Sequence, residues 1–401
     1  MQKVIALAGT LDTKGEDFAF VRDLIRGLGI GTLTIHTGVY KPGFEPDVSN
    51  AEVAAAAGVD IDTLAAGERS EATAAMAKGM EKLLPALYRE GRFDAVLSLG
   101  GSGGTSIVAP GMRALPIGVP KMIVSTLAGG DVSVYVGESD IFMYPSIVDV
   151  AGLNSISVKI YTNAAFAIAG MVKFESEAQP AHKPLIAATM FGVTTPCVTA
   201  AKAYLEKEGY EVVIFHAVGT GGRSMEALIS AGFFKGVLDL TTTEWCDELF
   251  GGVLSAGPHR LEAAGRKGVP QVVSVGALDM VNFGAFDTVP EKYKGRNLYR
   301  HNPTVTLMRT TPEENAALGE MIAKKLNAAA GKTALMLPLK GVSMLDKEGG
   351  AFFGEAEDKA LFGALRAKVD RAKVEVVELE NNINDEAFAV AAAKKLLELM
   401  K

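Results

Sequence analysis

Apolar runs alternate with amphipathic segments along the whole chain. Residues 4–9, VIALAG, form a continuous apolar run, which is typical of a strand buried on both faces of a parallel sheet. The next segment carries apolar residues at helical spacing, as Phe18 and Val21 show, and Asp12 or Thr13 is the expected N-cap of that helix. This alternation of strand and helix predicts an α/β fold built from βαβ units.

Further strands follow from the same pattern in both halves of the chain. They are predicted at residues 31–39, 93–99, 119–126, 184–192, 211–219, 235–242, 332–341 and 373–382, with a strand and a loop at 269–284. Amphipathic segments lie between them, so we expect a mostly parallel, doubly wound sheet in each half.

The two halves resemble each other. Gly9 and His36 end the first two predicted strands, and Phe191 and His216 take the corresponding places later in the chain. VLSLGG likewise parallels VLDLTT, although convergence of βαβ units would give the same pattern. The polar, proline-containing segment near residue 180 separates the halves. We therefore predict two tandem Rossmann-like subdomains, 1–180 and 181–401.

Composition narrows the class of protein. The chain has 401 residues, 48% of them hydrophobic and 22% charged, and its net charge is −7. These values are typical of globular proteins, and the absence of a basic stripe argues against direct binding of nucleic acid. Cys197 and Cys246 are too few for a disulfide framework or a zinc site. We see neither a signal peptide nor a membrane-spanning run, and expect a cytoplasmic protein.

A glycine-rich loop is the first candidate for chemistry. Residues 98–106, SLGGSGGTS, follow a predicted strand, and their glycines leave backbone N–H groups open to a phosphate. Lys14 could supply a positive charge, and Asp12 could hold Mg²⁺ directly or through water. The alternative is a tight turn that binds no ligand. Leu326 and Ser106 stand where the Walker and dinucleotide motifs require glycine, which excludes the first motif and weakens the second.

The second half offers a different set of candidates. HAVGTGGRS, residues 216–224, resembles an anion cradle that opens a helix. The predicted catalytic residues are His216, Arg223, Asp239 and Arg300, which could bind an anionic substrate and move a proton. Structural roles as a strand-end histidine and salt-bridged side chains are the alternative. Further candidates at the same edge are Glu244, Arg260, Asp279, Asn282, Lys340 and Ser343.

Several long motifs carry a resemblance to a known family. GTLDTKGED, LSLGGSGGT, STLAGGDVSVYVGESDI and TTTEWCDELFGGVLSAGP resemble the Tm-one-like ATP-binding family over essentially the whole chain. The resemblance implies two Rossmann-like subdomains, ATP bound by the first, and a homodimer. By matching position it implies a nucleotide pocket formed by Asp12, Thr13, Lys14, Gly100, Gly101, Ser102, Gly103, Gly104 and Thr105. It implies as neighbours of that pocket Ser125, Thr126, Gly130, Asp140, Asp149 and Asn154.

The sequence therefore favours an ATP-dependent or ATP-regulated enzyme. We expect it to act on a small anionic metabolite in a cleft between the two subdomains. A nucleotide-binding regulatory protein without turnover is one alternative, and an NAD(P)- or sugar-phosphate-binding enzyme is another.

Overall fold

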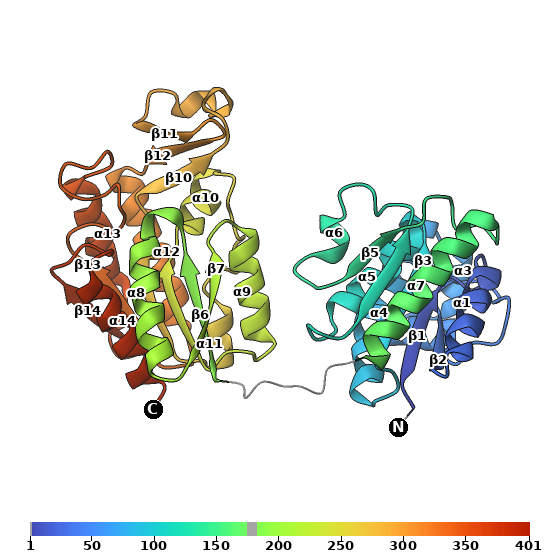
Figure 1. Cartoon of the computed structure of the whole chain (residues 1–401). Coiled ribbons are helices and arrows are strands. Elements are labelled where there is room, and N and C mark those ends of the chain that lie inside the picture. Colours follow the sequence, from blue (N-terminus) through green and yellow to red (C-terminus); the bar gives the residue numbers. More distant parts are fainter. Residues whose placement is uncertain (1, 175–182) are drawn as a thin grey trace. The chain divides into compact units, whose positions relative to one another are not determined.

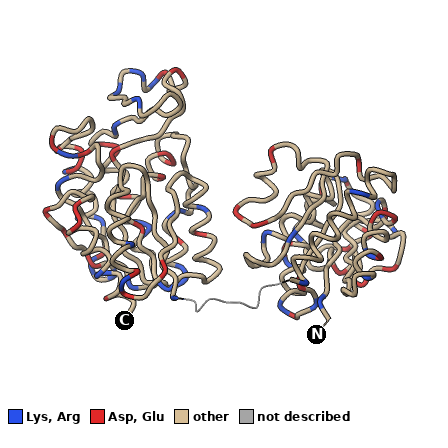
Figure 2. The backbone as a smooth tube through the Cα atoms, viewed as in Figure 1, with Lys and Arg blue, Asp and Glu red and all other residues tan. Residues whose placement is uncertain are grey.

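The structure is a computed structural model that describes residues 2–174 and 183–401. The chain divides into two compact units, residues 1–179 and 180–401, which are described one at a time (Figure 1). The predicted division at residue 180 falls outside the described residues. Acidic and basic residues are interspersed along both units (Figure 2).

The first unit is a five-stranded sheet with the order β2-β1-β3-β4-β5, and every pair of neighbours is parallel. Its strands are β1 (Val4–Gly9), β2 (Gly31–His36), β3 (Ala95–Gly100), β4 (Lys121–Ser125) and β5 (Phe142–Pro145). Its helices are α1 (Gly15–Gly27), α2 (Asn50–Ala57), α3 (Ile61–Ala66), α4 (Arg69–Arg89), α5 (Ser102–Arg113), α6 (Ser133–Val136) and α7 (Ser155–Lys173).

Both faces of this sheet are covered, because alternate residues of each strand point to opposite sides. Ala6 and Ala8 of β1 pack in one core with α2, α4 and α5, whereas Ile5 and Leu7 pack in the other with α1 and α7. By length and composition alone, α7 is apolar enough to cross a membrane. Its buried face, which includes Tyr161, packs in the second of these cores, whereas Ile156 and Phe166 are exposed.

The second unit contains a six-stranded parallel sheet, in the order β14-β13-β9-β8-β6-β7. Its strands are β6 (Leu185–Met190), β7 (Glu211–His216), β8 (Gly236–Thr241), β9 (Gln271–Gly276), β13 (Thr333–Pro338) and β14 (Val374–Leu379). Its helices are α8 (Thr195–Lys207), α9 (Thr220–Ser230), α10 (Glu244–Phe250), α11 (Ala263–Lys267), α12 (Pro312–Asn327), α13 (Glu355–Lys368) and α14 (Glu386–Leu399). Helices α8 and α14 cover one face, and α9 to α13 cover the other.

A small antiparallel sheet was not predicted. It consists of β10 (Met280–Phe283), β11 (Leu298–Asn302) and β12 (Val305–Arg309), in the order β10-β12-β11. The three strands are inserted between β9 and β13 (Figure 1). The α/β class, the two Rossmann-like units and the mostly parallel sheets are confirmed, and this insertion is the antiparallel exception.

The two units share strand order and pairing register. The order β2-β1-β3-β4 of the first unit recurs as β7-β6-β8-β9 in the second. Gly9 pairs with His36, as Met190 pairs with His216. Val96 pairs with Lys121 as Val237 pairs with Gln271, so equivalent positions can be counted from these pairs. Counted along β3 and β8 from these pairs, Gly103 takes the place of Glu244. The β8–β9 pairing shifts register after Asp239, and Glu244 is the first residue of α10 whereas Gly103 is the second residue of α5. The common register supports a duplication more strongly than the sequence pattern does.

The start of α1 differs from the prediction. Lys14 occupies the N-cap position and no side chain caps the helix. Asp12 Oδ2 instead accepts a hydrogen bond from the backbone N–H of Tyr40, at 3.1 Å. Asp12 is therefore directed to the loop after β2 and away from the helix it was expected to cap.

Candidate functional site

A pocket of about 520 Å³ lies at the carboxyl ends of β1, β2 and β3 in the first unit. The chain passes from β1 to β2 on one side of β1 and then returns to β3 on its other side, so the strand order reverses here. Open parallel sheets bind ligands in the crevice that such a reversal creates. This pocket is therefore the candidate functional site of the first unit.

The glycine-rich loop forms one wall of the pocket. Gly100 ends β3, Gly101 is the N-cap of α5, and no side chain caps that helix. Ser102, Gly103 and Gly104 line the pocket, so the N–H groups of the first helical turn lie at its wall. These groups have no partner within a helix and attract anions.

The fold itself explains only part of this glycine content. A Cβ on Gly100 would lie 3.2 Å from the Cα of Gly104, a close approach that favours glycine. A Cβ on Gly103 would meet nothing nearer than Nη2 of Arg69, at 3.8 Å, and one on Gly104 would meet only the carbonyl of Leu99, at 3.6 Å. The protein has room for a side chain at residue 103, so that glycine is better explained by something that occupies the pocket.

Two basic residues stand at the pocket. The Lys14 ammonium donates a hydrogen bond to the carbonyl oxygen of Val150. Arg69 begins α4 and lines the same pocket, and among residues 2–174 and 183–401 its guanidinium has no hydrogen-bond or ion-pair partner. Sequence reasoning missed Arg69, because no motif marks it and only the packing of α4 brings it to the glycine loop. Together with the α5 N-terminus, these cations favour a polyanion.

Asp12 is the one carboxylate in the lining of this pocket. Its Oδ1 atom is buried and has no hydrogen-bond partner among the residues that the structure describes, and a Cβ on Gly38 would lie 2.3 Å from it. Gly38 was also missed, and it is the glycine that lets the carboxylate lie against the chain. Among the described residues no three His, Cys, Asp or Glu side chains gather to hold a metal ion. A divalent ion would thus need ligand oxygens in addition to Asp12, as Mg²⁺ bound with phosphates does.

The opposite part of the pocket is apolar. Val39, Leu64, Met76 and Ile107 line it, from the loop after β2 and from α3, α4 and α5. A cavity with an apolar wall and a few convergent polar groups is typical of a small-molecule site. This one combines a cationic end with an apolar end.

Some predicted nucleotide neighbours lie at or beneath this pocket. Thr13 lines it. Thr105 and Ser125 are buried under the loop, where their hydroxyl oxygens are 2.8 Å apart. Thr126 Oγ1 lies 3.5 Å from the position of a Cβ on Gly101. Thr105 and Ser125 therefore support the loop from below.

The remaining predicted neighbours do not line the pocket. Asn154 caps α7, since its side chain accepts hydrogen bonds from Ile156 and Ser157. Asp149 accepts a hydrogen bond from the backbone of the next residue, and Asp140 forms an ion pair with buried Lys121. Gly130 lies in the turn after β4, where its N–H bonds to the carbonyl of Leu127. Local hydrogen bonds account for each of these residues.

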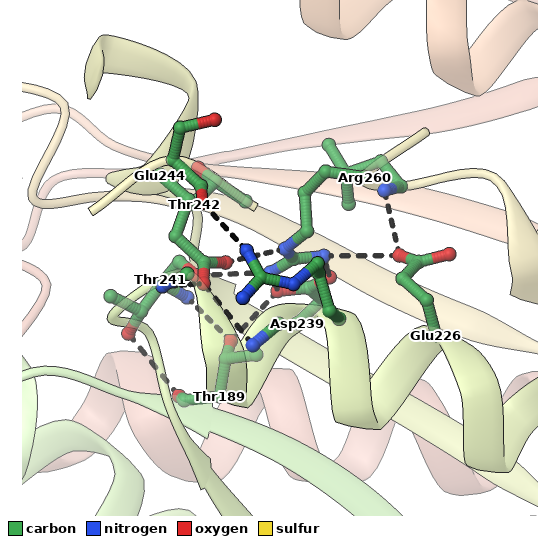
Figure 3. A network of polar contacts seen from close by, with 12 residues as sticks. Thr189, Glu226, Asp239, Thr241, Thr242, Glu244 and Arg260 are labelled. Carbon is green, nitrogen blue, oxygen red and sulfur yellow. Dashed lines mark hydrogen bonds and ion pairs between the residues drawn. The ribbon is translucent and has the colours of Figure 1, made fainter. Parts of the chain in front are cut away.

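The corresponding place in the second unit is filled by a buried ion cluster (Figure 3). Arg260 donates to Asp239 Oδ1 through Nη2 at 2.7 Å, and to Glu244 Oε2 through Nε at 2.6 Å. Glu226 completes the cluster, 3.4 Å from Nη1 of Arg260. Arg260, Asp239 and Glu244 are each 1% exposed. Burial raises the pKa of Glu244, and the adjacent Arg260 opposes that shift.

Glu244 also occupies the predicted anion cradle. Its Oε1 atom accepts hydrogen bonds from the N–H groups of Gly219, at 2.7 Å, and Gly222, at 3.1 Å. A Cβ on Gly222 would lie 2.3 Å from Oε2 of Glu244, so glycine is required there. The motif does bind an anion, and that anion is a carboxylate of the protein itself. The expectation of an open anion site at this motif is therefore corrected.

The four predicted catalytic residues each have another partner. Asp239 belongs to the buried cluster, which leaves it no access to a substrate. His216 is exposed and stacks on Phe191, with ring centroids 5.5 Å apart. Arg223 donates to the carbonyl of Ser255 at 3.1 Å.

Arg300 lies on β11 of the antiparallel sheet, with its guanidinium 3.9 Å from the centre of the Phe286 ring. Its place on this insertion separates it from the sheet edge that carries His216. Asp239, predicted to be catalytic, is instead a salt-bridged structural residue.

Comparison with known proteins gives a family match over both units. The N-terminal domain of "Uncharacterised protein family (UPF0261)" matches residues 3–177, and the C-terminal domain of the same family matches residues 183–400. A UPF0261 protein of Clostridium tetani is 55% identical over 100% of both chains. One from Rhizobium meliloti is 50% identical over 97% of both.

A longer plant protein is also similar. The "ToMV resistance protein Tm-1(GCR237)" of Solanum lycopersicum is 39% identical over 98% of this chain, which spans 55% of the tomato protein. Among solved structures, UDP-N-acetylglucosamine 2-epimerase from Rickettsia bellii covers 100% of this chain, and 96% of that chain is matched, with 12% identity and a TM-score of 0.22. A score at that level carries no argument.

Proposed function

The chain belongs to the UPF0261 family, and we propose that its first unit binds ATP in the pocket at the ends of β1, β2 and β3. The observation that carries this proposal is the uncapped N-terminus of α5, with Gly103 facing the Arg69 guanidinium, which has no partner in the described part of the chain. The phosphates would bind to the N–H groups of α5, Lys14 and Arg69, and the adenine to the wall that includes Leu64 and Met76. The choice of ATP among nucleotides rests on the family resemblance of the motifs.

Magnesium fits the same pocket through Asp12. The buried, unpartnered Oδ1 atom is suited to a cation or to one of its water ligands. Asp12→Asn is expected to weaken binding of Mg-ATP much more than binding of metal-free ATP. Titration calorimetry with and without EDTA measures this difference, and equal weakening of both would remove the metal from the proposal.

The experiment for ATP itself uses the equivalence of Gly103 and Glu244. Gly103→Glu places a carboxylate where the phosphates would lie, and Coulomb repulsion there should lower ATP affinity at least about 100-fold, or about 2.7 kcal/mol. Gly27→Glu is the matched control, since Gly27 is an exposed glycine of α1 with no atom near its Cβ position. Normal ATP binding by a folded Gly103→Glu variant would overturn the proposal.

Thermal shifts then compare ATP with other ligands. A ligand present at about 100 times its Kd stabilises the protein by roughly 2.7 kcal/mol. A larger shift with NAD or a sugar phosphate would replace ATP as the ligand of this pocket. Light scattering with and without ATP tests the homodimer that the resemblance implies.

Binding of ATP could have two different consequences for activity. In an ATP-dependent enzyme the bound nucleotide would supply a phosphoryl or adenylyl group, whereas in an ATP-regulated enzyme it would change affinity for an anionic metabolite. Incubation with Mg-ATP and metabolite pools, followed by assay of ADP, AMP and pyrophosphate, separates them. Absence of all three products, together with retained binding, would favour regulation.

A further inference from the structure

A second pocket, of about 640 Å³, opens at the carboxyl ends of β13 and β14 in the second unit. Leu339 and Lys340 follow β13, Glu380 follows β14, and the first turns of α13 contribute Glu355 and Asp358. The pocket lies at the ligand-binding edge of a parallel sheet, and none of these residues belongs to the Arg260 cluster. We infer that it binds a small zwitterion, a molecule that carries both a carboxylate and an ammonium group.

The charged side chains around this pocket are of both signs. In the described part of the chain, the ammonium groups of Lys340 and Lys359 have no ion-pair or hydrogen-bond partner. The same holds for the carboxylates of Glu348, Glu355 and Glu380, and all five charged residues are exposed, so that water solvates them until a ligand binds. A ligand with one sign of charge would satisfy one set and be repelled by the other. A zwitterion can pair its carboxylate with a lysine and its ammonium with a glutamate.

A metal ion does not account for these carboxylates. No three acidic, histidine or cysteine side chains in the described ranges come together as metal ligands. Arg366, which also lines the pocket, is already engaged by Glu378 through two hydrogen bonds of 2.8 Å. The lysines and glutamates therefore remain the groups that are open to a ligand.

The pocket also has a partly buried floor. Asp358 lies 3.4 Å from Nη2 of Arg309, which is 3.4 Å from Asp346 in turn. Burial, followed by repulsion from Asp346, raises the pKa of Asp358 to about 8. Asp358 thus retains a proton near neutral pH, which it shares with Asp346, and so it adds no negative charge that would repel a ligand carboxylate.

An apolar patch completes the pocket. Leu339, Phe353 and Phe362 line it, and Phe353 is 46% exposed. The volume lies within the range of known small-molecule sites. An α-amino acid, whose side chain would meet these residues, is the class of zwitterion that fits best.

The test uses the full chain and a set of L-α-amino acids as probes. Each amino acid is compared with the acid that lacks its amino group and the amine that lacks its carboxyl group, by saturation-transfer NMR and calorimetry. At least one amino acid is expected to bind at least tenfold more tightly than both counterparts. No binding by any amino acid, or equal binding of a counterpart, would overturn the inference.

Two lysine variants test whether the amino acid binds in this pocket. Lys340→Met is expected to lower that affinity at least tenfold, whereas Lys347→Met, an exposed lysine in the same loop, leaves it unchanged. Equal affinities of the two variants would contradict the location. Neither variant should change ATP affinity, so this test and that of the first unit succeed or fail separately.

A pH profile tests Asp358. Binding by the native chain should weaken above about pH 8, where Asp358 loses its proton. Asp358→Asn has no carboxyl to titrate at this position, so its profile should remain flat there. The charged groups that act on Asp358 are Arg309, Asp346 and Asp279. Lys359 and Glu355 line the same pocket. A profile for Asp358→Asn identical to that of the native chain would remove Asp358 from the site.

Discussion

The two units use one scaffold in opposite ways at the crevice beside their first strand. In the first unit the start of α5, after β3, carries Gly103, and Arg69 lines the pocket above it with no partner among the described residues. In the second unit the equivalent residue is Glu244, whose carboxylate is bound by Arg260 and by the N–H groups of Gly219 and Gly222. One crevice is thus open to an anion from outside, and the other contains its own.

The difference shows how a duplicated fold can separate binding from stability. A carboxylate on the chain saturates a cradle permanently, because it is always present at high effective concentration. The buried cluster then becomes part of the folded structure, and unit 2 loses the ligand site that its topology would otherwise provide. Gly103 leaves the equivalent position free in unit 1.

The largest expected effect comes from breaking the filled crevice. Arg260→Met removes the cation from Asp239 and Glu244, which are buried, and leaves their charges uncompensated. Such a change typically costs about 3–5 kcal/mol. Hydrogen exchange followed by mass spectrometry should show faster opening throughout residues 183–401, and unchanged protection in residues 2–174.

Arg266→Met serves as the control for this change. Arg266 is an exposed residue of α11, and its ion pair with Glu262 should contribute less than about 1 kcal/mol. Equal protection in the Arg260→Met and Arg266→Met variants would mean that the cluster does not support unit 2.

A second prediction concerns pH and the other buried charges of unit 2. Burial raises the pKa of Asp279 to about 7 and that of Asp358 to about 8, and it also raises the pKa of Asp346. The folded state therefore retains protons that the unfolded chain loses near pH 4. Stability from these groups is complete below about pH 4 and declines as the pH rises toward 8.

Unit 2 should accordingly lose at least about 1.4 kcal/mol between pH 5 and pH 8, the equivalent of one pKa unit. Urea unfolding monitored through Trp245, the one tryptophan of the chain, measures this loss. Asp279→Asn should make the profile flatter, and Asp287→Asn, an exposed neighbour in sequence, should not. An unchanged slope for Asp279→Asn would show that its carboxyl does not carry the titration.

The strands of both parallel sheets could be predicted from their continuous apolar runs, except β5 (Phe142–Pro145). That strand was missed because it is short and its four residues are exposed or half-buried. The strand β11 could not be predicted either, since four of its five residues, Tyr299 to Asn302, are exposed and show no alternation. Its pairing with β12 is determined by tertiary contacts and not by local sequence propensity. The sequence indicated the duplication only as a weak pattern. The shared strand order and strand pairing in the structure support it further.

The site residues also include some that the sequence could reveal and others that it could not. The glycine loop was found because four glycines within residues 100–104 are unusual in any chain. Arg69 carries no such mark, and Glu244 could not be assigned to residues 219–222 because their contact joins segments distant in sequence. For the same reason Asp239 was predicted to be catalytic, whereas Arg260 buries it in an ion pair. The spacing of charged residues along the chain cannot show which of them form ion pairs with one another in the fold.

A third prediction concerns the open crevice of the first unit. Arg69→Met should lower ATP affinity about tenfold, or about 1.4 kcal/mol, because one charge-assisted contact with phosphate is lost. Stability should hardly change, since the guanidinium is exposed. Arg89→Met, at the other end of α4, is the matched control and should bind ATP normally. If both variants bind ATP equally, Arg69 does not contact the nucleotide.

The smallest expected effect addresses why residue 103 is glycine. Gly103→Ala places a methyl group in a helix where the protein offers room, so it should stabilise unit 1 by about 0.4–1 kcal/mol. Gly363→Ala in α13 has an equally open Cβ position and should stabilise unit 2 to a similar extent. Thermal unfolding measures both gains, and calorimetry should show weaker ATP binding for Gly103→Ala alone. Stabilisation with loss of binding would mean that this glycine serves the ligand at a small cost to the fold. If Gly103→Ala instead destabilises unit 1 and binds ATP normally, the glycine serves the turn, and the contrast with Glu244 concerns structure only.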